Sequence, residues 1–401
     1  MFSAENILSA LSRKSLRRQL RTLDETEGTL IRIEDRTLVN FASNDYLGLS
    51  QHPALREAAK QAIDRFGVGT GASRLITGST ALHARLEEQL SLLKTTEAAL
   101  TFSSGYAAAL GTIPSVVTSG DVIILDKLSH ACLIDAAKLS GATIRVYPHN
   151  DLTKLRDHLV WAKQEYPGRT ILILTESVFS MDGDLGALSA IVDLKDRFGA
   201  MLFVDEAHAT GIFGKQGEGL IHQLRLSDRV EIQMGTLSKA IGVSGGFICG
   251  SRSLIDLLIN RARSFIYSTA PPPAVAATAS AAVDLIQSSE GDGLRERLWK
   301  NIRYLWQVLP GPHRTVEEPS SPIVPIMVGE ESKAVAMAAA ILESGYFAPA
   351  IRYPTVKRGS ARLRVTVSSA HSEEQIDGLA KAIDRESWIQ VARSADPTHD
   401  G

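Results

Sequence analysis

Lys239 is the residue whose surroundings best fit covalent chemistry. It stands in GTLSKAIGVSGG (235–246), just past an apolar stretch and among small hydroxyl residues and glycines. An ordinary lysine lies on a water-facing helix, where its amine stays charged. An amine partly removed from water has a lowered pKa and a larger neutral fraction. A neutral amine is suited to a Schiff base with an aldehyde, so Lys239 is the candidate nucleophile.

Other polar residues are expected at the ends of apolar strands, where parallel α/β sheets bind their ligands. They are Asp126 with His130, Glu176 with Ser180, Asp205 with His208, and Thr236 and Ser238 with Lys239. Asp205 follows the apolar run MLFV, and an unpaired buried carboxylate costs on the order of several kcal/mol, so it needs a cationic partner. For Asp126 and for the histidines a purely structural role stays open, because an acid at a strand end often caps a helix.

One cofactor would account for both Lys239 and Asp205. Pyridoxal phosphate offers an aldehyde to the lysine, a pyridinium nitrogen to the carboxylate, and a phosphate to hydroxyls and free backbone N–H groups. Two glycine-rich stretches, GVGTGASRLITGST (67–80) and SSGYAAALG (103–111), supply such groups next to helical sequence. The alternative is a loop lysine that reaches solvent. No metal site is expected.

Rival motifs fit less well. GVSGG (242–246) matches the G-x-S-x-G pattern of hydrolases, but that serine must close a strand and open a helix. Here the apolar run FICG follows the serine directly, so the order is wrong. The sequence contains no dinucleotide fingerprint, no phosphate-binding G-x-x-x-x-G-K-[ST] and no H-E-x-x-H.

Composition sets broad limits on function. The 401 residues are 44% hydrophobic and 22% charged, with a formal net charge of −2. This balance gives no reason to expect nucleic acid or an anionic membrane as a partner. The two cysteines, Cys132 and Cys249, form neither a CxxC pair nor a disulfide framework, which fits a reducing compartment. With neither a signal peptide nor a membrane span in evidence, a cytoplasmic protein is expected.

The middle of the chain alternates strands and helices. Apolar runs at 121–126, 142–148, 170–177 and 200–208 are separated by helical patterns, and Ser129 and Gly141 are expected to begin and end the first helix. This predicts an α/β fold with a mostly parallel sheet covered on both faces. The last third predicts a smaller α+β domain. The expected organisation is an N-terminal segment (1–50), a large domain (51–288), a small domain (289–391) and a polar tail (392–401).

Motifs distributed along nearly the whole chain resemble the α-oxoamine synthases. They are NDYLGL (44–49), GASRLITGST (71–80), FSSGYAA (102–108), LSHACL (128–133), VFSMDGD (178–184), VDEAHATGIFG (204–214), GTLSKAIGVSGG (235–246) and YSTAPPP (267–273). This family of fold-type-I pyridoxal-phosphate transferases condenses an amino acid with an acyl thioester. The resemblance implies a large domain with a mostly parallel seven-stranded sheet, a smaller C-terminal α+β domain, and a homodimer with shared active sites.

The C-terminal signature favours one branch of the family. APAIRYPTV (348–356), GSARLRVTVSSAH (359–371) and SSEGDGLRERL (288–298) resemble members that use L-alanine and a pimeloyl thioester, on coenzyme A or an acyl-carrier protein, in biotin biosynthesis. Tyr353 and Lys357 depart from that pattern, so it leaves the acyl chain length open. The alternatives are a sister activity such as glycine C-acetyltransferase, an aminotransferase, or a non-enzymatic protein that keeps the fold.

The resemblance also implies roles for individual residues near the cofactor. Lys239 would hold the cofactor and act as base, Asp205 would keep the pyridinium protonated, His130 would stack on the ring, and His208 would bind its phenolic oxygen. The remaining cofactor contacts would come from Gly105, Tyr106, Ser180 and Thr236, and from Ser268 and Thr269 toward the partner subunit's site.

Substrate contacts follow from the same resemblance. Asn44, Ser180 and Arg364 would bind the amino-acid carboxylate, and His130 would face the substrate. Arg362 and Arg364 alternate on one strand and share a face, so the pattern alone does not separate them; the family's arginine is the second of the pair. Thr355 would contact the acyl group together with an N-terminal arginine, Arg17 or its neighbour Arg18, of which Arg17 is preferred.

Overall fold

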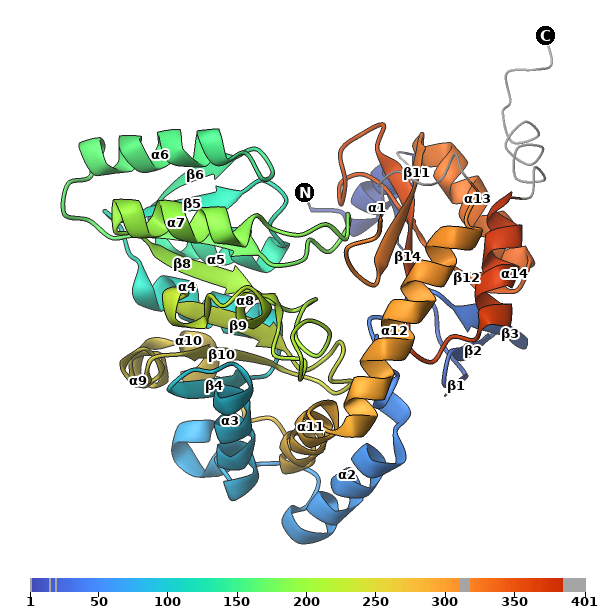
Figure 1. Cartoon of the computed structure of the whole chain (residues 1–401), viewed down its shortest axis with the longest axis horizontal. Coiled ribbons are helices and arrows are strands. Elements are labelled where there is room, and N and C mark those ends of the chain that lie inside the picture. The colour runs from blue at the N-terminus through green and yellow to red at the C-terminus, as the bar shows by residue number, and fades with distance from the viewer. Residues whose placement is uncertain (1, 14–15, 19, 311–317, 385–401) are drawn as a thin grey trace.

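The computed structural model describes residues 2–384 apart from 14–15, 19 and 311–317. A large α/β unit and a smaller α+β unit lie side by side, and the long helix α12 (Ser289–Val308) leads into the smaller one (Figure 1). This is the predicted fold class. The domain boundaries at 51 and 289 stay predictions, and residues 385–401, which include the predicted tail, lie outside the described residues.

The large unit is built on a seven-stranded sheet. Its order is β4 (Ala98–Phe102), β10 (Gly246–Gly250), β9 (Ile232–Thr236), β8 (Met201–Asp205), β7 (Ile171–Glu176), β5 (Val122–Asp126) and β6 (Thr143–Tyr147). The strands β9, β8, β7, β5 and β6 are parallel, whereas β10 runs antiparallel to both of its neighbours. The mostly parallel sheet predicted from the sequence is confirmed.

Helices cover both faces of this sheet (Figure 1). One apolar core lies under α3 (Ala81–Leu93), α6 (Leu152–Glu165), α7 (Leu188–Phe198), α8 (Leu220–Gln223) and α11 (Pro273–Ile286). The other lies under α4 (Gly105–Val116), α5 (Ala131–Ser140), α9 (Arg252–Arg261) and α10 (Arg263–Ile266). This double cover explains why these strands read as continuous apolar runs in the sequence.

The alternation of side chains along the strands decides which core each residue joins. Leu202 and Val204 of β8 belong to the core under α6 and α7, and Phe203 belongs to the core under α4 and α5. Because the period of a strand is two residues, Asp205 lies on the α4–α5 side and Glu206 on the opposite side. Two neighbouring carboxylates are thus directed into different surroundings.

Both ends of the chain build the small unit. One sheet has the order β11 (Ile323–Gly329), β14 (Ala361–Thr366), β13 (Ala350–Ile351), and another joins the N-terminal strands β1 (Glu25–Glu27), β2 (Leu30–Ile33) and β3 (Arg36–Asn40) to β12 (Tyr346–Phe347). The helices α13 (Glu331–Glu343) and α14 (Glu373–Asp384) complete this unit. The N-terminal segment contributes to this unit, because β3 pairs in parallel with β12.

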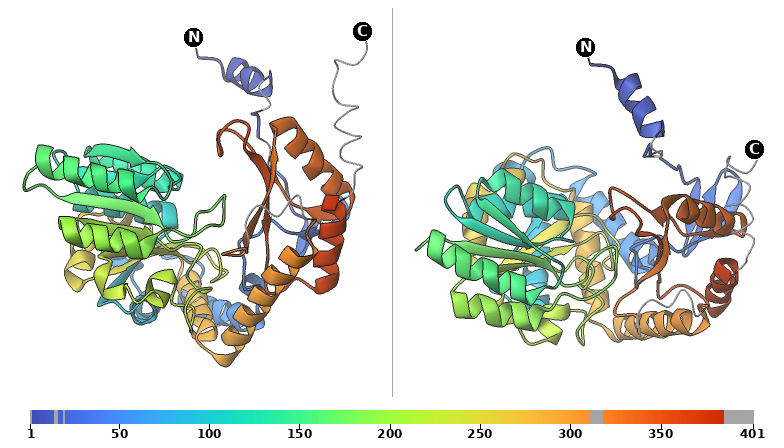
Figure 2. Two further views of the ribbon diagram at one scale, coloured as in Figure 1. Left: turned by 45° about the horizontal axis from the view of Figure 1, so that its top comes forward. Right: turned by 90° about the horizontal axis from the view of Figure 1, so that it is seen from above.

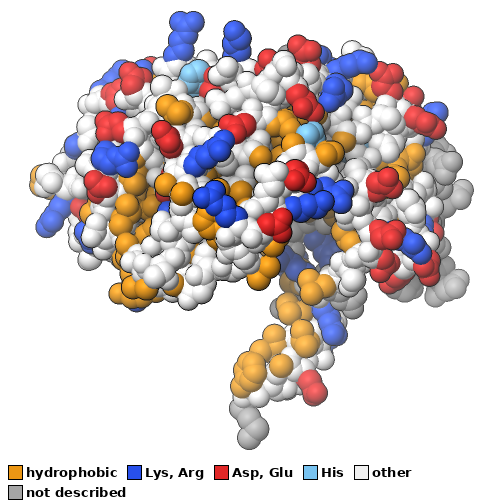
Figure 3. Space-filling model, turned by 90° about the horizontal axis from the view of Figure 1, so that it is seen from below, with side chains coloured by type: hydrophobic (Ala, Val, Ile, Leu, Met, Phe, Trp, Pro, Cys, Tyr) orange, Lys and Arg blue, Asp and Glu red, His pale blue; other side chains and the backbone are white. Residues whose placement is uncertain are grey.

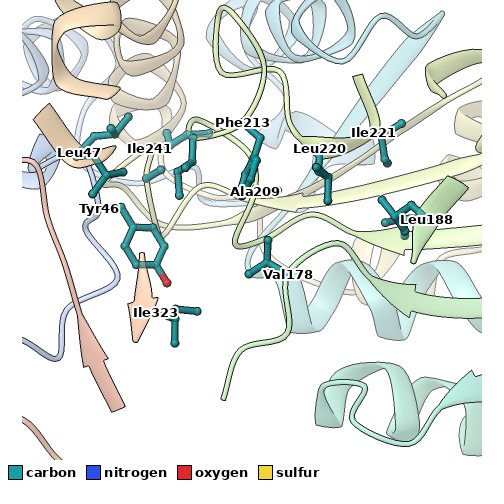
Figure 4. Packing of buried hydrophobic residues seen from close by; sticks show 14 of the residues in the cluster. Tyr46, Leu47, Val178, Leu188, Ala209, Phe213, Leu220, Ile221, Ile241 and Ile323 are labelled. Atoms are coloured by element: carbon teal, nitrogen blue, oxygen red, sulfur yellow. The ribbon is translucent and has the colours of Figure 1, made fainter. Parts of the chain in front are cut away.

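The two units share one continuous core. Tyr46, Val178 and Ile323, from the N-terminal segment, the large unit and the small unit, belong to a single buried cluster, and Figure 4 shows them close to one another. The chain reaches this junction through the short helix η1 (Leu49–Gln51) and α2 (Pro53–Phe66). This packing fixes the two units against each other.

The N-terminal helix α1 (Ala4–Arg13) projects from the body of the molecule (Figure 2). None of its residues is buried, and hydrophobic side chains lie along it in the space-filling view (Figure 3). Among the helices of the described ranges, none is both long and apolar enough to cross a membrane.

Candidate active site

Asp205 and Lys239 form the floor of the candidate site. Asp205, the last residue of β8, is 5% exposed, and its side chain accepts a hydrogen bond of 2.8 Å from the N–H of Ala207. Burial raises the pKa of Asp205, and the charge of Lys239 opposes that shift. Burial lowers the pKa of Lys239, against the charges of Asp205 and Glu176, in the direction expected from the sequence. The two charges thus act on each other, although no ion pair joins these two residues in the described chain.

Glu176, at the end of β7, positions His130. Its carboxylate accepts the backbone N–H of His130, and the Nδ1 atom of His130 accepts the N–H of Cys132 at 3.3 Å, which caps α5. The expected cap, Ser129, is wrong: the more exposed histidine takes that place because its ring can fold back onto the first turn. Gly141 ends the helix with φ of 74°, as predicted. Burial lowers the pKa of His130, which favours a neutral ring.

His208 is buried next to Tyr46. The hydroxyl of Tyr46 lies 2.7 Å from Nδ1 of His208 and 3.0 Å from Oδ1 of Asn44. Burial holds the pKa of His208 well below its usual value, with a further lowering by the charge of Lys239. The imidazole is therefore neutral, and its orientation is fixed by the tyrosine.

The structure separates the two arginines of β14. The guanidinium of Arg362 pairs with Asp182, so its charge is compensated within the chain. Arg364 instead donates to two neutral acceptors, the carbonyl of Ser180 at 2.6 Å and Oδ1 of Asn44 at 3.1 Å. Among the described residues Arg364 forms no ion pair, although it is only 7% exposed. A buried arginine with an uncompensated charge is suited to a carboxylate ligand.

A cradle for an anion lies at the N-terminus of α4. The first N–H groups of this twelve-residue helix, at Gly105 and Tyr106, have no partner within the helix. Gly105 lies so close to Thr236 and Gly246 that a Cβ at Gly246 would approach the Gly105 nitrogen to 2.4 Å. The hydroxyl of Thr236 donates to the Gly245 carbonyl at 2.8 Å. Backbone N–H groups are thus free beside the positive end of a helix, with the Thr236 side chain next to them.

This donor set fits the predicted cofactor. A phosphate matches the start of α4, an aldehyde matches the weakly basic amine of Lys239, and a pyridinium nitrogen matches Asp205. The buried Asp205 carboxylate decides the question, because its single hydrogen bond within the described chain is too little to offset its burial. The residues present therefore fit pyridoxal phosphate.

A basic cavity adjoins Thr355. It has a volume of about 940 Å³ and lies among the N-terminal arm, β2–β3, α13 and the β12–β13 segment; its arginines are Arg17, Arg18, Arg21, Arg36 and Arg352. The guanidinium of Arg18 donates to the Thr355 hydroxyl at 3.5 Å. The sequence assigned the N-terminal contact with the acyl group by preference to Arg17, and that assignment stays a prediction. It is Arg18 that contacts Thr355, while both arginines line the cavity. Beside Thr355, the guanidinium of Arg358 lies 4.3 Å from the ring centre of Tyr353.

Ser268 and Thr269 lie on a different surface. Thr269 forms an isolated β-bridge with Ser73, and the Ala270 N–H donates to the Ala72 carbonyl at 3.0 Å. Their predicted contact with a partner's cofactor stays a prediction. The nucleophile-elbow alternative is wrong: Ser244 precedes the strand β10 and does not open a helix.

Two features of the site were not read from the sequence. Asp126 does not contact His130 but accepts from Nδ1 of His149 at 3.0 Å, a residue that had no assigned role. Glu176 was noted at its strand end, but its bond to the His130 N–H depends on a backbone conformation that the sequence does not show. The signal available for His149 was its position after β6, at the same edge of the sheet.

Comparisons with known proteins agree with this geometry. The pattern of the family Aminotransferase class I and II matches residues 36–383. A serine palmitoyltransferase from S. paucimobilis with a bound PLP–myriocin aldimine has a TM-score of 0.89 and 28% identity, and each chain is covered to 97%. These matches define the class as fold-type-I pyridoxal-phosphate transferases.

More specific matches narrow the class. The 8-amino-7-oxononanoate synthase of Geobacter sulfurreducens is 45% identical over 378 residues, or 94% of this chain and 96% of that one. The structure of 8-amino-7-oxononanoate synthase from Francisella tularensis has a TM-score of 0.74 and 28% identity, covering 88% of this chain and 99% of that chain. The chain belongs to the 8-amino-7-oxononanoate synthase family, and the branch predicted from the C-terminal signature is confirmed.

Proposed function

We propose that the chain catalyses the decarboxylative condensation of L-alanine with a pimeloyl thioester. The products are 8-amino-7-oxononanoate, carbon dioxide and the free thiol of the carrier, in a step of biotin biosynthesis. One observation carries the proposal: Asp205 ends β8 and Lys239 follows the neighbouring strand β9, and the charges that act on Lys239 include Asp205 and the buried Arg364. A base, a carboxylate that needs a cation and a cation that needs a carboxylate thus face one site.

The residues divide the work as follows. Bound pyridoxal phosphate supplies an electron sink for negative charge at the α-carbon of the amino acid. Asp205 holds a proton on the pyridine nitrogen, and Lys239 moves the proton at the α-carbon. Arg364 and Asn44 orient the carboxylate of alanine, which fixes the reacting carbon relative to the base.

The full set of proposed site residues follows the sequence prediction. Lys239, Asp205, His130 and His208 are the catalytic set. Cofactor contacts are Gly105, Tyr106, Ser180, Thr236, Ser268 and Thr269, and substrate contacts are Asn44, His130, Ser180, Thr355, Arg364 and an N-terminal arginine, Arg17 or Arg18. The bond between Arg18 and Thr355 supports Arg18 as the arginine on the acyl side.

A homodimer is part of the proposal. The surface near Ser268 and Thr269 exposes large apolar side chains, among them Ile76 at 76% and Tyr267 at 73%. Clustered apolar side chains that water would otherwise surround favour burial against a second copy. This supports a shared site in which Ser268 and Thr269 approach the partner's cofactor.

A product assay tests the function. Purified protein loaded with pyridoxal phosphate is incubated with L-alanine and pimeloyl-CoA, or with pimeloyl-acyl-carrier protein, and 8-amino-7-oxononanoate is measured by mass spectrometry. Borohydride reduction followed by peptide mapping should fix the cofactor on the peptide containing Lys239. Light scattering of the same preparation should give the mass of a dimer.

The matched control is the pair glycine and acetyl-CoA. Turnover of that pair, without turnover of the alanine pair, would move the protein to the sister activity glycine C-acetyltransferase. Conversion of the cofactor to its amine form by an amino acid alone, with no thioester, would instead indicate an aminotransferase.

A further inference from the structure

Three side chains join the sheet to the loop that carries Ser180. This loop, residues 177–187 between β7 and α7, is called the Ser180 loop below. Asp126, fully buried at the end of β5, accepts from Nδ1 of His149 at 3.0 and 3.1 Å, and Nε2 of His149 lies 2.7 Å from Oδ2 of Asp184 in the loop. None of the three has a role in the proposed reaction.

The bridge is an ion triad. An imidazole donates through both nitrogens only when it is protonated, and carboxylates stand at both ends. Burial by itself lowers the pKa of His149, but hydrogen bonds and charges from Asp126 and Asp184 outweigh it and raise the pKa to about 10. His149 is therefore an imidazolium that joins the carboxylate of Asp126, at the end of β5, to the carboxylate of Asp184 in the loop.

The fixed end of the bridge is rigid. Asp126 also accepts the N–H groups of Leu128 at 2.8 Å and Asn150 at 3.0 Å. Its carboxylate is thus held from three directions at the end of a central strand. Any restraint that His149 transmits acts on the loop and not on the sheet.

Neighbouring contacts clamp the Ser180 loop on both sides of Ser180. The amide of Asn150 donates to the Leu185 carbonyl at 3.0 Å and accepts the Ala187 N–H at 3.1 Å. The ring of Phe179 packs edge-on against His149, with centroids 4.3 Å apart. The loop is therefore fixed directly before Ser180 and again after Asp182.

The clamped segment is the surface on which the small unit rests. The Ser180 carbonyl accepts from Arg364, Asp182 pairs with Arg362, and the Gly183 carbonyl accepts from Ser321 at 2.7 Å. Gly183 has φ of 71°, and a Cβ there would approach the Ile323 carbonyl to 2.2 Å. The loop and the small unit line a cavity of only about 30 Å³, room for about one water. A shift of the loop must therefore move the arginines or break their bonds.

We propose that His149 is a positioning residue for the amino-acid substrate: it fixes the Ser180 loop so that the Ser180 carbonyl aims Arg364 at the substrate carboxylate. The inference rests on the proposed function in so far as Arg364 is the carboxylate ligand. It assigns His149 no contact with cofactor or substrate. Of the two substrates, only the amino acid should feel its effect.

This confinement separates positioning from simple structural support. Thr355 and Arg18, on the acyl side, have no bond to the Ser180 loop in the described chain. Loss of the bridge should therefore weaken the binding of alanine and leave the binding of the thioester unaffected. A residue that only stabilised the fold would change both constants, or neither, as long as the protein stayed folded.

The test compares His149→Gln with His158→Gln in the loaded enzyme. His158 is the matched control: a histidine on α6 whose ring nitrogen lies 3.3 Å from the Val146 carbonyl, away from the loop. In His149→Gln the KM for L-alanine should rise about tenfold, with the KM for pimeloyl-CoA within about twofold of the unaltered protein. Hydrogen exchange of amides 178–186 should speed up in this variant alone.

A second variant guards against misfolding. Asp184→Asn keeps an oxygen acceptor but removes the charge, and it should give the same selective rise in smaller measure. An unchanged alanine constant, an equal rise in both constants, or unaltered exchange of the loop would overturn the proposal. If the unaltered protein used glycine in place of alanine, the proposed function would fail, whereas the effect of His149 would remain measurable with glycine, which has the same carboxylate.

Discussion

Asp205 and Glu206 are neighbours at the end of β8, yet they lie in opposite kinds of surroundings. Glu206 is fully buried and pairs with Lys94, itself 1% exposed, while its other oxygen accepts the Ile221 N–H at 2.9 Å. Asp205, on the other face of the sheet, has one backbone N–H within the described chain. Both carboxylates are removed from water to nearly the same extent.

The difference separates a buried carboxylate whose partner is in the chain from one whose partner must be a bound ligand. A buried charge that has its partner in the chain contributes to the fold, and its removal should change stability. A buried charge whose partner must come from outside should change activity when it is removed. Burial raises the pKa of Asp205, which is the sign of an environment that is incomplete without a cation.

The largest expected effect comes from Asp205→Asn. The amide is nearly isosteric but cannot hold a proton on the pyridine nitrogen by charge, so turnover should fall roughly 10,000-fold, or ~5 kcal/mol of activation free energy. The free energy of unfolding of the protein without cofactor should stay the same or rise, since an uncompensated buried charge is lost. Steady-state product formation and urea unfolding give the two numbers. Near-normal turnover would show that the carboxylate has no catalytic partner.

The next largest effect is expected on the other face, from Lys94→Met. This change leaves Glu206 buried without its partner and should lower the free energy of unfolding by about 3–5 kcal/mol. Turnover per folded molecule should stay within about threefold, because Lys94 lies away from the site. In Lys94→Met/Glu206→Gln much of the stability should return. A fall in turnover per folded molecule well beyond threefold would contradict the division between the two faces of the sheet.

The smallest effect concerns His371, a buried histidine whose two ring nitrogens both have hydrogen-bond partners when the ring is neutral. Its Nδ1 accepts the Ser368 N–H at 2.9 Å, its Nε2 lies 3.1 Å from the Asn40 carbonyl, and burial lowers its pKa to about 4. As pH falls below 6.5 the unfolded chain binds this proton and the folded chain does not. The histidine should therefore cost up to about 3 kcal/mol of stability by pH 4.

Urea unfolding at a series of pH values measures this cost. Above pH 6.5 the residue contributes no slope, because both states are neutral. His371→Gln should lower stability at neutral pH, where the bonds of the imidazole are lost, and should reduce the slope between pH 6.5 and 4 by up to one proton. Equal slopes in both proteins would mean that another group titrates in that range.

Patterns that depend on local spacing predicted much of this molecule. Apolar runs and the polar residues after them predicted the large sheet and the placement of Asp205 and Lys239 at the ends of its strands. This was possible because each strand and the loop that follows it are contiguous in the sequence. The resemblance then supplied roles for those positions. Gly141 at the end of α5 is of the same local kind.

Relations between distant segments could not be predicted in the same way. Arg362 and Arg364 share a face, and they are distinguished only because Asp182, from another unit, takes the first of them. The bridge from Asp126 through His149 to Asp184 spans three segments, and the spacing of its members carries no signal. Likewise, the pairing of β3 with β12 follows from tertiary packing and not from the short, mostly exposed N-terminal strands.

That pairing of β3 with β12 bears on how the chain can fold as it is synthesised. The N-terminal strands leave the ribosome first, but their partner, and the side-chain bond from Arg36 to Glu343 beside it, lies 307 positions later. The sheet of the large unit is complete once β10 has emerged, and the helices that cover it end with α11, so that unit can fold before β12 is made and while β1–β3 are still unpaired. The strand β14, which carries Arg364, is made last among the described strands. Vectorial synthesis thus delays the assembly of a competent site until nearly the whole polypeptide has been made.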